Sequence, residues 1–208
     1  MRKIGILIDN NSWLLKYKRE LTNKIKSLQC KVELFKNHKS VKKCDILFIL
    51  GCKKILKNKL LKKNKLNLVI HESELPKGKG MSPVSNQLLT GKKKIICTMF
   101  IATERVDSGP IILRDKFVIG KLDLYEDWRE KQAKTTIRMC SRLLKTKKIN
   151  FQVQKGRPTF FSKLVKEKFK IDPKKTILSQ IHKLQAADFK KFRPYFKFKK
   201  KIFYIHNE

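Results

Sequence analysis

The sequence predicts an α/β fold, a doubly wound and mostly parallel sheet, on two observations. Short apolar runs of strand length alternate with stretches whose apolar residues recur at helical spacing. Such alternation is typical of a parallel sheet covered by helices on both faces. The chain of 208 residues is 41% hydrophobic, which suffices for one well-formed core.

The first half of the chain supplies four of the predicted strands. They cover 4–8, 32–35, 45–50 and 67–71, each a run of β-branched or other apolar residues. Between the first two strands, apolar side chains recur at helical spacing from Trp13 to Leu28. A second, basic helical stretch is predicted over 54–63.

The second half continues the alternation with two strands and two helices. A short helix over 82–89 has Pro83 in its first turn, where proline is tolerated. Strands are predicted over 94–102 and 111–119. A long amphipathic helix follows over 125–144, and its inward stripe consists of Ala133, Ile137, Cys140 and Leu144.

The pattern becomes irregular towards the end, and we therefore predict a catalytic domain over 1–150 with a basic, aromatic extension over 151–208. A helix near 175–184 and a last strand near 202–205 are expected in this extension. Its aromatic side chains interleave with lysine, which is compatible with a stacking platform for bases. The favoured interpretation is a small hydrophobic cover packed on the catalytic domain, since so short a tail must bury its aromatics somewhere.

Composition limits the classes of function. The formal net charge is +35, from 43 Lys and 9 Arg against 17 acidic residues, and two interpretations stay open. Either the lysines form a solvated surface, which we favour, or part of them bind nucleic acid or another polyanion. Five widely spaced cysteines predict reduced, mostly buried thiols, and no metal site is expected. The absence of a long apolar run and of a signal peptide predicts a cytoplasmic protein.

Two loop motifs indicate chemistry. His71 ends the strand over 67–71 and opens the run His-Glu-Ser-Glu-Leu-Pro-Lys-Gly-Lys-Gly, and Asp107 opens Asp-Ser-Gly-Pro-Ile-Ile after the strand over 94–102. Ligands of open α/β sheets bind in the crevice at the strand ends, where His71 would lie. A histidine oriented by a carboxylate is a common general acid and base. We expect the second loop to fold back beside the first, so that the two side chains meet.

The pattern His-x-Ser-x-Leu-Pro-x-x-x-Gly followed by Asp-x-Gly-x-Ile resembles the folate-dependent formyltransferases. A third segment, Gly51-Cys52-Lys53-Lys54-Ile55-Leu56, stands where that family carries its pterin-pocket loop. The resemblance covers about residues 1–120. It implies a Rossmann-like formyltransferase domain that moves a formyl group from 10-formyltetrahydrofolate to a primary amine.

By this resemblance His71 stabilises the oxyanion of the tetrahedral intermediate, and Asp107 holds His71 and relays protons. The family carries an Asn two residues before the histidine, where this chain has Val69. Val69 and Asn67 share the face of His71, because positions alternate along a strand. We take Asn67 as the replacement donor. Alternatives are Asn86, Ser85 or a main-chain amide within 77–80.

The resemblance also implies a folate site. The pterin would lie against Cys52, Lys54, Ile55 and Leu56 and against the loop that contains Ala102, Val106 and Gly109. Lys54 would meet the anionic tail of the folate, and Gly109 would keep its loop tight.

The amine acceptor is chosen by elimination, and an amino-sugar nucleotide of surface-polysaccharide synthesis is favoured. The turn Asp9-Asn10-Asn11-Ser12 lacks the glycines with which glycinamide ribonucleotide enzymes hold a phosphate. Methionyl-tRNA enzymes usually carry a further β-barrel domain, for which the chain is short. Both acceptors stay open as alternatives, as do a non-catalytic nucleic-acid-binding role and a homodimer.

Overall fold

The computed structural model describes residues 1–207 and confirms the predicted fold class. A six-stranded sheet has the order β2-β1-β3-β4-β6-β7. Its strands are β1 (Lys3–Leu7), β2 (Lys31–Phe35), β3 (Ile46–Ile49), β4 (Leu66–His71), β6 (Lys94–Ile101) and β7 (Ile111–Val118). Neighbours among β1 to β4 are parallel, whereas β6 is antiparallel to both β4 and β7.

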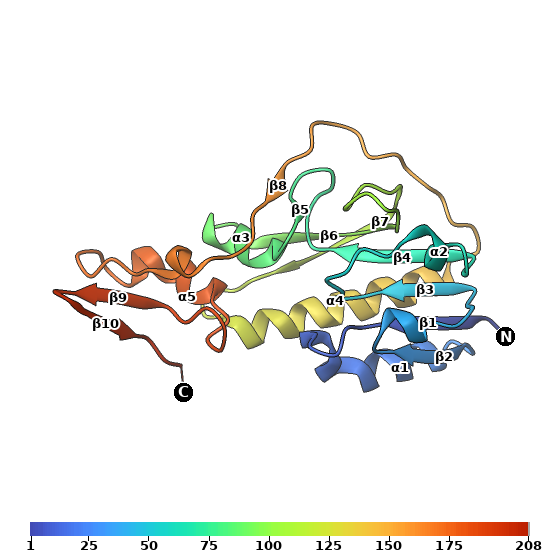
Figure 1. Cartoon of the computed structure of the whole chain (residues 1–208), viewed down its shortest axis with the longest axis horizontal. Coiled ribbons are helices and arrows are strands. Elements are labelled where there is room, and N and C mark those ends of the chain that lie inside the picture. Colours follow the sequence, from blue (N-terminus) through green and yellow to red (C-terminus); the bar gives the residue numbers. More distant parts are fainter. Residues whose placement is uncertain (208) are drawn as a thin grey trace.

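Helices cover both faces of this sheet. On one face lie α1 (Lys18–Lys26), which the 3-10 turn η1 (Trp13–Tyr17) precedes, and α4 (Tyr125–Lys145), which runs along the sheet in Figure 1. The other face carries α2 (Asn58–Leu61) beyond the 3-10 turn η2 (His38–Ser40). Side chains alternate between two cores as the strand period requires: Phe48 faces α1 and α4, and Leu47 and Ile49 face α2.

The stripe predicted on α4 is buried as expected, and four of the five cysteines are buried free thiols, Cys52 being half-buried. Along the sequence, β4 is followed by the two-residue strand β5 (Lys79–Gly80) and then by α3 (Pro83–Leu89), before β6 begins. Helix α3 begins at proline as expected.

Two predicted helices are shorter than expected. The stretch over 54–63 is helical only from Asn58 to Leu61. The Asn58 N–H donates a hydrogen bond of 2.7 Å to the carboxylate of Glu104, which is distant in sequence, and the residues before Asn58 form a loop. The helix expected over 175–184 is α5 (Ile181–Ala186), preceded by the 3-10 turn η4 (Leu178–Gln180). The Gln180 side chain holds residues 172–176 as a turn by bonding the main chain of Asp172.

The C-terminal part is joined to the main core. It consists of β8 (Phe160–Phe161), η3 (Lys166–Phe169), η4, α5 and a hairpin of β9 (Tyr195–Phe198) and β10 (Lys201–Tyr204). Phe169 and Ala186 are fully buried in the same core as α4, and the indole of Trp128 donates to the Gln185 carbonyl at 2.8 Å. The strand predicted near 202–205 is β10, the second arm of the hairpin. Its first arm, β9, was not predicted from the sequence. The domain boundary at 150 stays a prediction.

Among residues 1–207, no helix has both the length and the apolar character that a membrane crossing requires.

Candidate active site

His71 is the last residue of β4 and is buried, with 7% of its surface exposed. Its Nε2 lies 2.8 Å from the carbonyl oxygen of Gly78. Because a carbonyl oxygen can only accept, Nε2 carries a proton and donates it to this bond. The other ring nitrogen, Nδ1, is therefore the atom at which a proton can be gained or lost.

Asp107 faces that second nitrogen. Its Oδ2 lies 3.7 Å from Nδ1 of His71 and accepts a hydrogen bond of 2.8 Å from the Gly80 main-chain N–H. The Asp107 backbone is left-handed, with φ of 45°, a conformation that aspartate tolerates better than most residues. The structure thus brings the two predicted catalytic side chains together.

The loop that carries Asp107 has to fold back to reach His71. Since β6 is antiparallel to β4, its last residue, Ile101, lies opposite Leu68, three residues before His71. At about 3.3 Å per residue, the loop over 102–110 must return about 10 Å along β4. Gly109 permits this return, because a Cβ built there would lie 1.7 Å from the Ile101 carbonyl oxygen.

A substitution at Gly109 tests this packing. Gly109→Ala is expected to lower the free energy of unfolding by about 3 kcal/mol, because the clashing atom belongs to the backbone and cannot rotate away. Gly156→Ala is the control, since Gly156 has a positive φ of 102° but no atom within 4 Å of the added Cβ, and its cost is about 1 kcal/mol. Urea unfolding of both variants gives the comparison, and equal losses would contradict the packing argument.

Asn67 is not placed as we expected. Its amide nitrogen donates to the Leu61 carbonyl at 2.8 Å, and its oxygen accepts from the Asn64 amide at 3.0 Å. The side chain thus joins the start of β4 to the end of α2, and its role as an oxyanion donor is not supported.

The other expected donors are also occupied. The Asn86 amide donates to the carbonyls of Met81, Ser82 and Ser162. The N–H groups of Gly78 and Lys79 donate to Thr159, and that of Gly80 donates to Asp107. The Ser85 hydroxyl makes no such hydrogen bond among residues 1–207, and Ser85 is buried in α3.

Lys79 is a residue that the sequence argument missed. It lies between Gly78 and Gly80, both of which contact the catalytic pair, and only 7% of its surface is exposed. Its ammonium donates to Ser108 Oγ at 2.8 Å, and no carboxylate oxygen of residues 1–207 lies within 4 Å of it. With 43 lysines in the chain, only burial distinguishes this one.

Three of the residues expected to hold the pterin, Cys52, Leu56 and Ala102, pack in one apolar cluster beside β4. Val69 of β4 packs against the same cluster. Lys54, Ile55 and Val106 are exposed, and Gly109 is buried. Burial raises the pKa of the Cys52 thiol to about 12, so it stays protonated at neutral pH and donates to the Leu7 carbonyl at 3.3 Å. An apolar wall beside exposed main chain suits a flat heterocycle.

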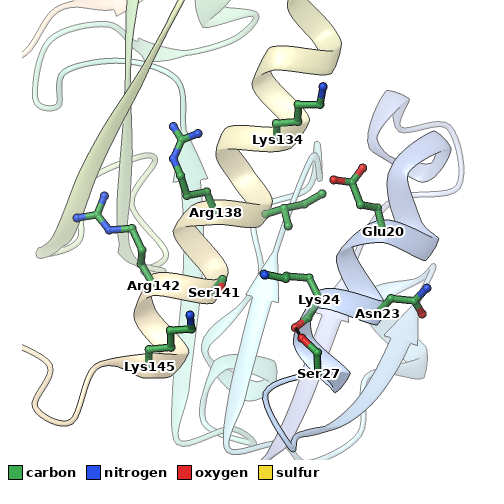
Figure 2. A pocket seen from close by; sticks show the side chains of 10 residues that line it. Glu20, Asn23, Lys24, Ser27, Lys134, Arg138, Ser141, Arg142 and Lys145 are labelled. Atoms are coloured by element: carbon green, nitrogen blue, oxygen red, sulfur yellow. Dashed lines mark hydrogen bonds between the residues drawn. The ribbon is translucent and has the colours of Figure 1, made fainter.

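A hollow elsewhere on the molecule shares no residue with this site. It measures about 790 Å³ and lies between α1 and α4, as Figure 2 shows. Its lining includes Lys24 and Ser27 of α1 and Ser141 and Lys145 of α4. Because neither His71 nor Asp107 lines this hollow, we take the catalytic pair, and not the hollow, as the candidate site.

A known protein family matches more than half of the chain. The family model described as "Formyl transferase" matches residues 17–144. The chain belongs to the formyl transferase family. The match contains both His71 and Asp107 and ends with α4, before the C-terminal part. The resemblance on which the sequence argument rested is confirmed.

Sequence relatives of the chain include methionyl-tRNA formyltransferases. The methionyl-tRNA formyltransferase of Thermosipho melanesiensis is 30% identical over 134 residues, which cover 62% of this chain and 44% of that protein. The chain thus spans less than half of that relative's length.

Solved structures share the fold at lower identity. Methionyl-tRNA formyltransferase from Clostridium thermocellum is 18% identical, with a TM-score of 0.79 and coverage of 99% of this chain and 97% of that one. A sugar N-formyltransferase from Shewanella sp. is 17% identical, with a TM-score of 0.70 and coverage of 100% and 97%.

Proposed function

We propose that this formyl transferase moves a formyl group from 10-formyltetrahydrofolate to a primary amine. The observation that carries the proposal is the pair of His71 and Asp107, 3.7 Å apart, beside the cluster of Cys52, Leu56 and Ala102. The folate would supply the formyl group. Its pterin would lie against that cluster, and the exposed Lys54 would meet its anionic tail.

His71 and Asp107 would manage the proton of the reaction. A carbon–nitrogen bond forms between the amine and the formyl carbon, the bond from that carbon to the folate nitrogen breaks, and one proton moves from the amine to the leaving nitrogen. The Nε2 proton of His71 is held by Gly78, so Nδ1 exchanges the proton while the Asp107 carboxylate stabilises the charged ring.

Lys79 would take over charge stabilisation from the family Asn that Val69 replaces. Its buried ammonium uses one of three protons on Ser108 and keeps two for a developing oxyanion. Among the side chains considered in place of the Asn, it alone carries a positive charge.

For the acceptor we propose a nucleotide-linked amino sugar. The Lys53 N–H donates a hydrogen bond of 2.8 Å to the Asp9 carboxylate, which joins the turn after β1 to the proposed folate loop. This turn carries an acid and contains no glycine. Such a turn opposes the phosphate of glycinamide ribonucleotide.

Methionyl-tRNA is the second candidate acceptor, favoured by the 30% identity to the Thermosipho enzyme. The C. thermocellum chain of that name is covered to 97%, so the length of the present chain does not argue against this acceptor.

The test is a formylation assay with 10-formyltetrahydrofolate and three acceptors offered separately: nucleotide-linked amino sugars, methionyl-tRNA and glycinamide ribonucleotide. We expect formylated amino sugar and release of tetrahydrofolate, both of which mass spectrometry detects. Formylation of methionyl-tRNA alone would favour the second candidate. No turnover with any acceptor, together with no binding of tetrahydrofolate by calorimetry, would contradict the proposed function.

A further inference from the structure

The segment that follows α4 contacts both catalytic loops. We call residues 146–161 the strap; in Figure 1 it runs in a wide arc from the end of α4 to β8. Its first contact is with β7, where the main chains of Gln152 and Ile111 exchange hydrogen bonds of 2.7 and 2.8 Å. Two residues later, the Gln154 amide nitrogen donates to the carbonyls of Asp107 and Gly109, at 2.9 and 2.8 Å.

The far end of the strap holds the other catalytic loop. Thr159 accepts the Gly78 N–H on its hydroxyl at 2.8 Å and the Lys79 N–H on its carbonyl at 2.9 Å. β8 then pairs with β5 in parallel. The fit is close, because a Cβ at Gly78 would lie 2.4 Å from the ring of Phe161. Gly78 is the residue whose carbonyl orients His71.

The Gln154 side chain is only half-satisfied in its hydrogen bonds, which argues against a role in stability alone. Its Oε1 is buried without a hydrogen-bond partner among residues 1–207, which offsets part of the gain from the two bonds of its amide nitrogen. Those two bonds hold the point where the loop turns back, at the left-handed Asp107. The side chain thus restrains the main chain at Asp107 and at Gly109, on either side of Ser108.

We propose that Gln154 and Thr159 are positioning residues for the formyl transfer, and that the strap sets the separation of His71 and Asp107. The inference rests on the proposed function. It goes beyond the family match, which ends at residue 144 and contains neither residue. Each acts through one partner, Gln154 through the main chain of Asp107 and Thr159 through Gly78.

The size of the effect follows from the geometry. Nδ1 of His71 and Oδ2 of Asp107 are 3.7 Å apart, so a further shift removes their contact. A misplacement of about 1 Å at reacting groups costs about 10²-fold in rate. Gln154 and Thr159 form no hydrogen bond to Cys52, Leu56 or Ala102, the apolar wall proposed for the pterin, so we expect them to affect kcat more than KM.

The first experiment compares Gln154→Ala with Gln152→Ala. Gln152 is two residues away in the strap and contacts Ile111 through its main chain, which the substitution keeps. We expect kcat of Gln154→Ala to fall on the order of 10–100-fold with KM changed less than about twofold. Gln152→Ala should match wild type. Equal kcat for the two variants would overturn the role of Gln154.

The second experiment uses Thr159. Thr159→Val keeps the shape and removes the hydroxyl that Gly78 needs, whereas Thr159→Ser keeps the hydroxyl. We expect about a tenfold lower kcat for the valine variant and values near wild type for the serine variant. Hydrogen exchange of the peptide over 72–81 should accelerate in the valine variant only. Unchanged exchange and unchanged kcat would overturn the role of Thr159.

A double-mutant cycle separates positioning from general loosening. Gln154→Ala should lower kcat by less than about twofold in an Asp107→Asn background, because asparagine tolerates the left-handed backbone but cannot act as the carboxylate. Additive losses would overturn the inference. If the wild type transfers no formyl group, the proposed function fails, and hydrogen exchange of the Thr159 variants still shows whether the strap holds the His71 loop.

Discussion

His71→Gln is expected to lower kcat for formyl transfer by about 10²–10⁴-fold. Glutamine keeps an N–H group that can reach the Gly78 carbonyl, so the loop over 72–80 should keep its shape, but it cannot exchange a proton with Asp107. Steady-state kinetics with saturating folate measures the loss.

The control for this substitution is His206→Gln, because His206 is exposed and lines a hollow with Tyr125 and Phe189 that contains no residue of either catalytic loop. We expect wild-type kinetics from it. A His71→Gln enzyme that turns over within threefold of wild type, and unfolds at the same urea concentration, would remove His71 from the mechanism and with it the site.

Val69→Asn is expected to raise kcat by about 10²-fold. The side chain at 69 lies on the His71 face of β4, where the family resemblance implies an Asn that binds the oxyanion, and one such donor is typically worth 10²–10³ in turnover. Val69 also packs against Leu75, Phe100 and Ile111, so the polar amide should cost about 1–3 kcal/mol of stability. Kinetics at a temperature well below the unfolding transition separates the two effects.

Val69→Ala is the matched control, since it removes the same packing without adding a donor, and its kcat should not rise. Lys79→Met should lower kcat about tenfold or more in the wild type and less in the Val69→Asn background, because two donors would then share one task. A folded Val69→Asn enzyme with no gain, combined with an inert Lys79→Met, would show that neither position faces the oxyanion.

The sequence predicted best those elements whose apolar pattern lies within the element itself. The strand ending at His71 follows from a continuous apolar run, and the inward stripe of α4 follows from helical spacing; both are present. The expected helix over 54–63 was too long because non-local acceptors decide its start. Asp9 takes the Lys53 N–H and Glu104 takes the Asn58 N–H, and neither contact is visible in the segment itself.

The candidate site divides in the same way. The motifs predict His71 at the end of a strand and Asp107 in a loop. Strand alternation also predicts Asn67 as a donor, but its amide instead bonds the end of α2. Lys79 was one lysine of many until its burial was known. Gln154 and Thr159 carried no signal, because nothing in their own neighbourhood distinguishes a polar strap residue from a solvated one.

The sequence by itself determined the doubly wound sheet, the family and the two side chains that would carry the chemistry, since hydrophobic period and motif spacing are properties of neighbouring residues. Only the tertiary structure decided how those side chains meet. The hydrogen bonds that fold the Asp107 loop back and hold the His71 loop join residues 27, 47 and 81 positions apart. Contacts over such separations depend on how the whole chain packs, and local pattern does not encode them.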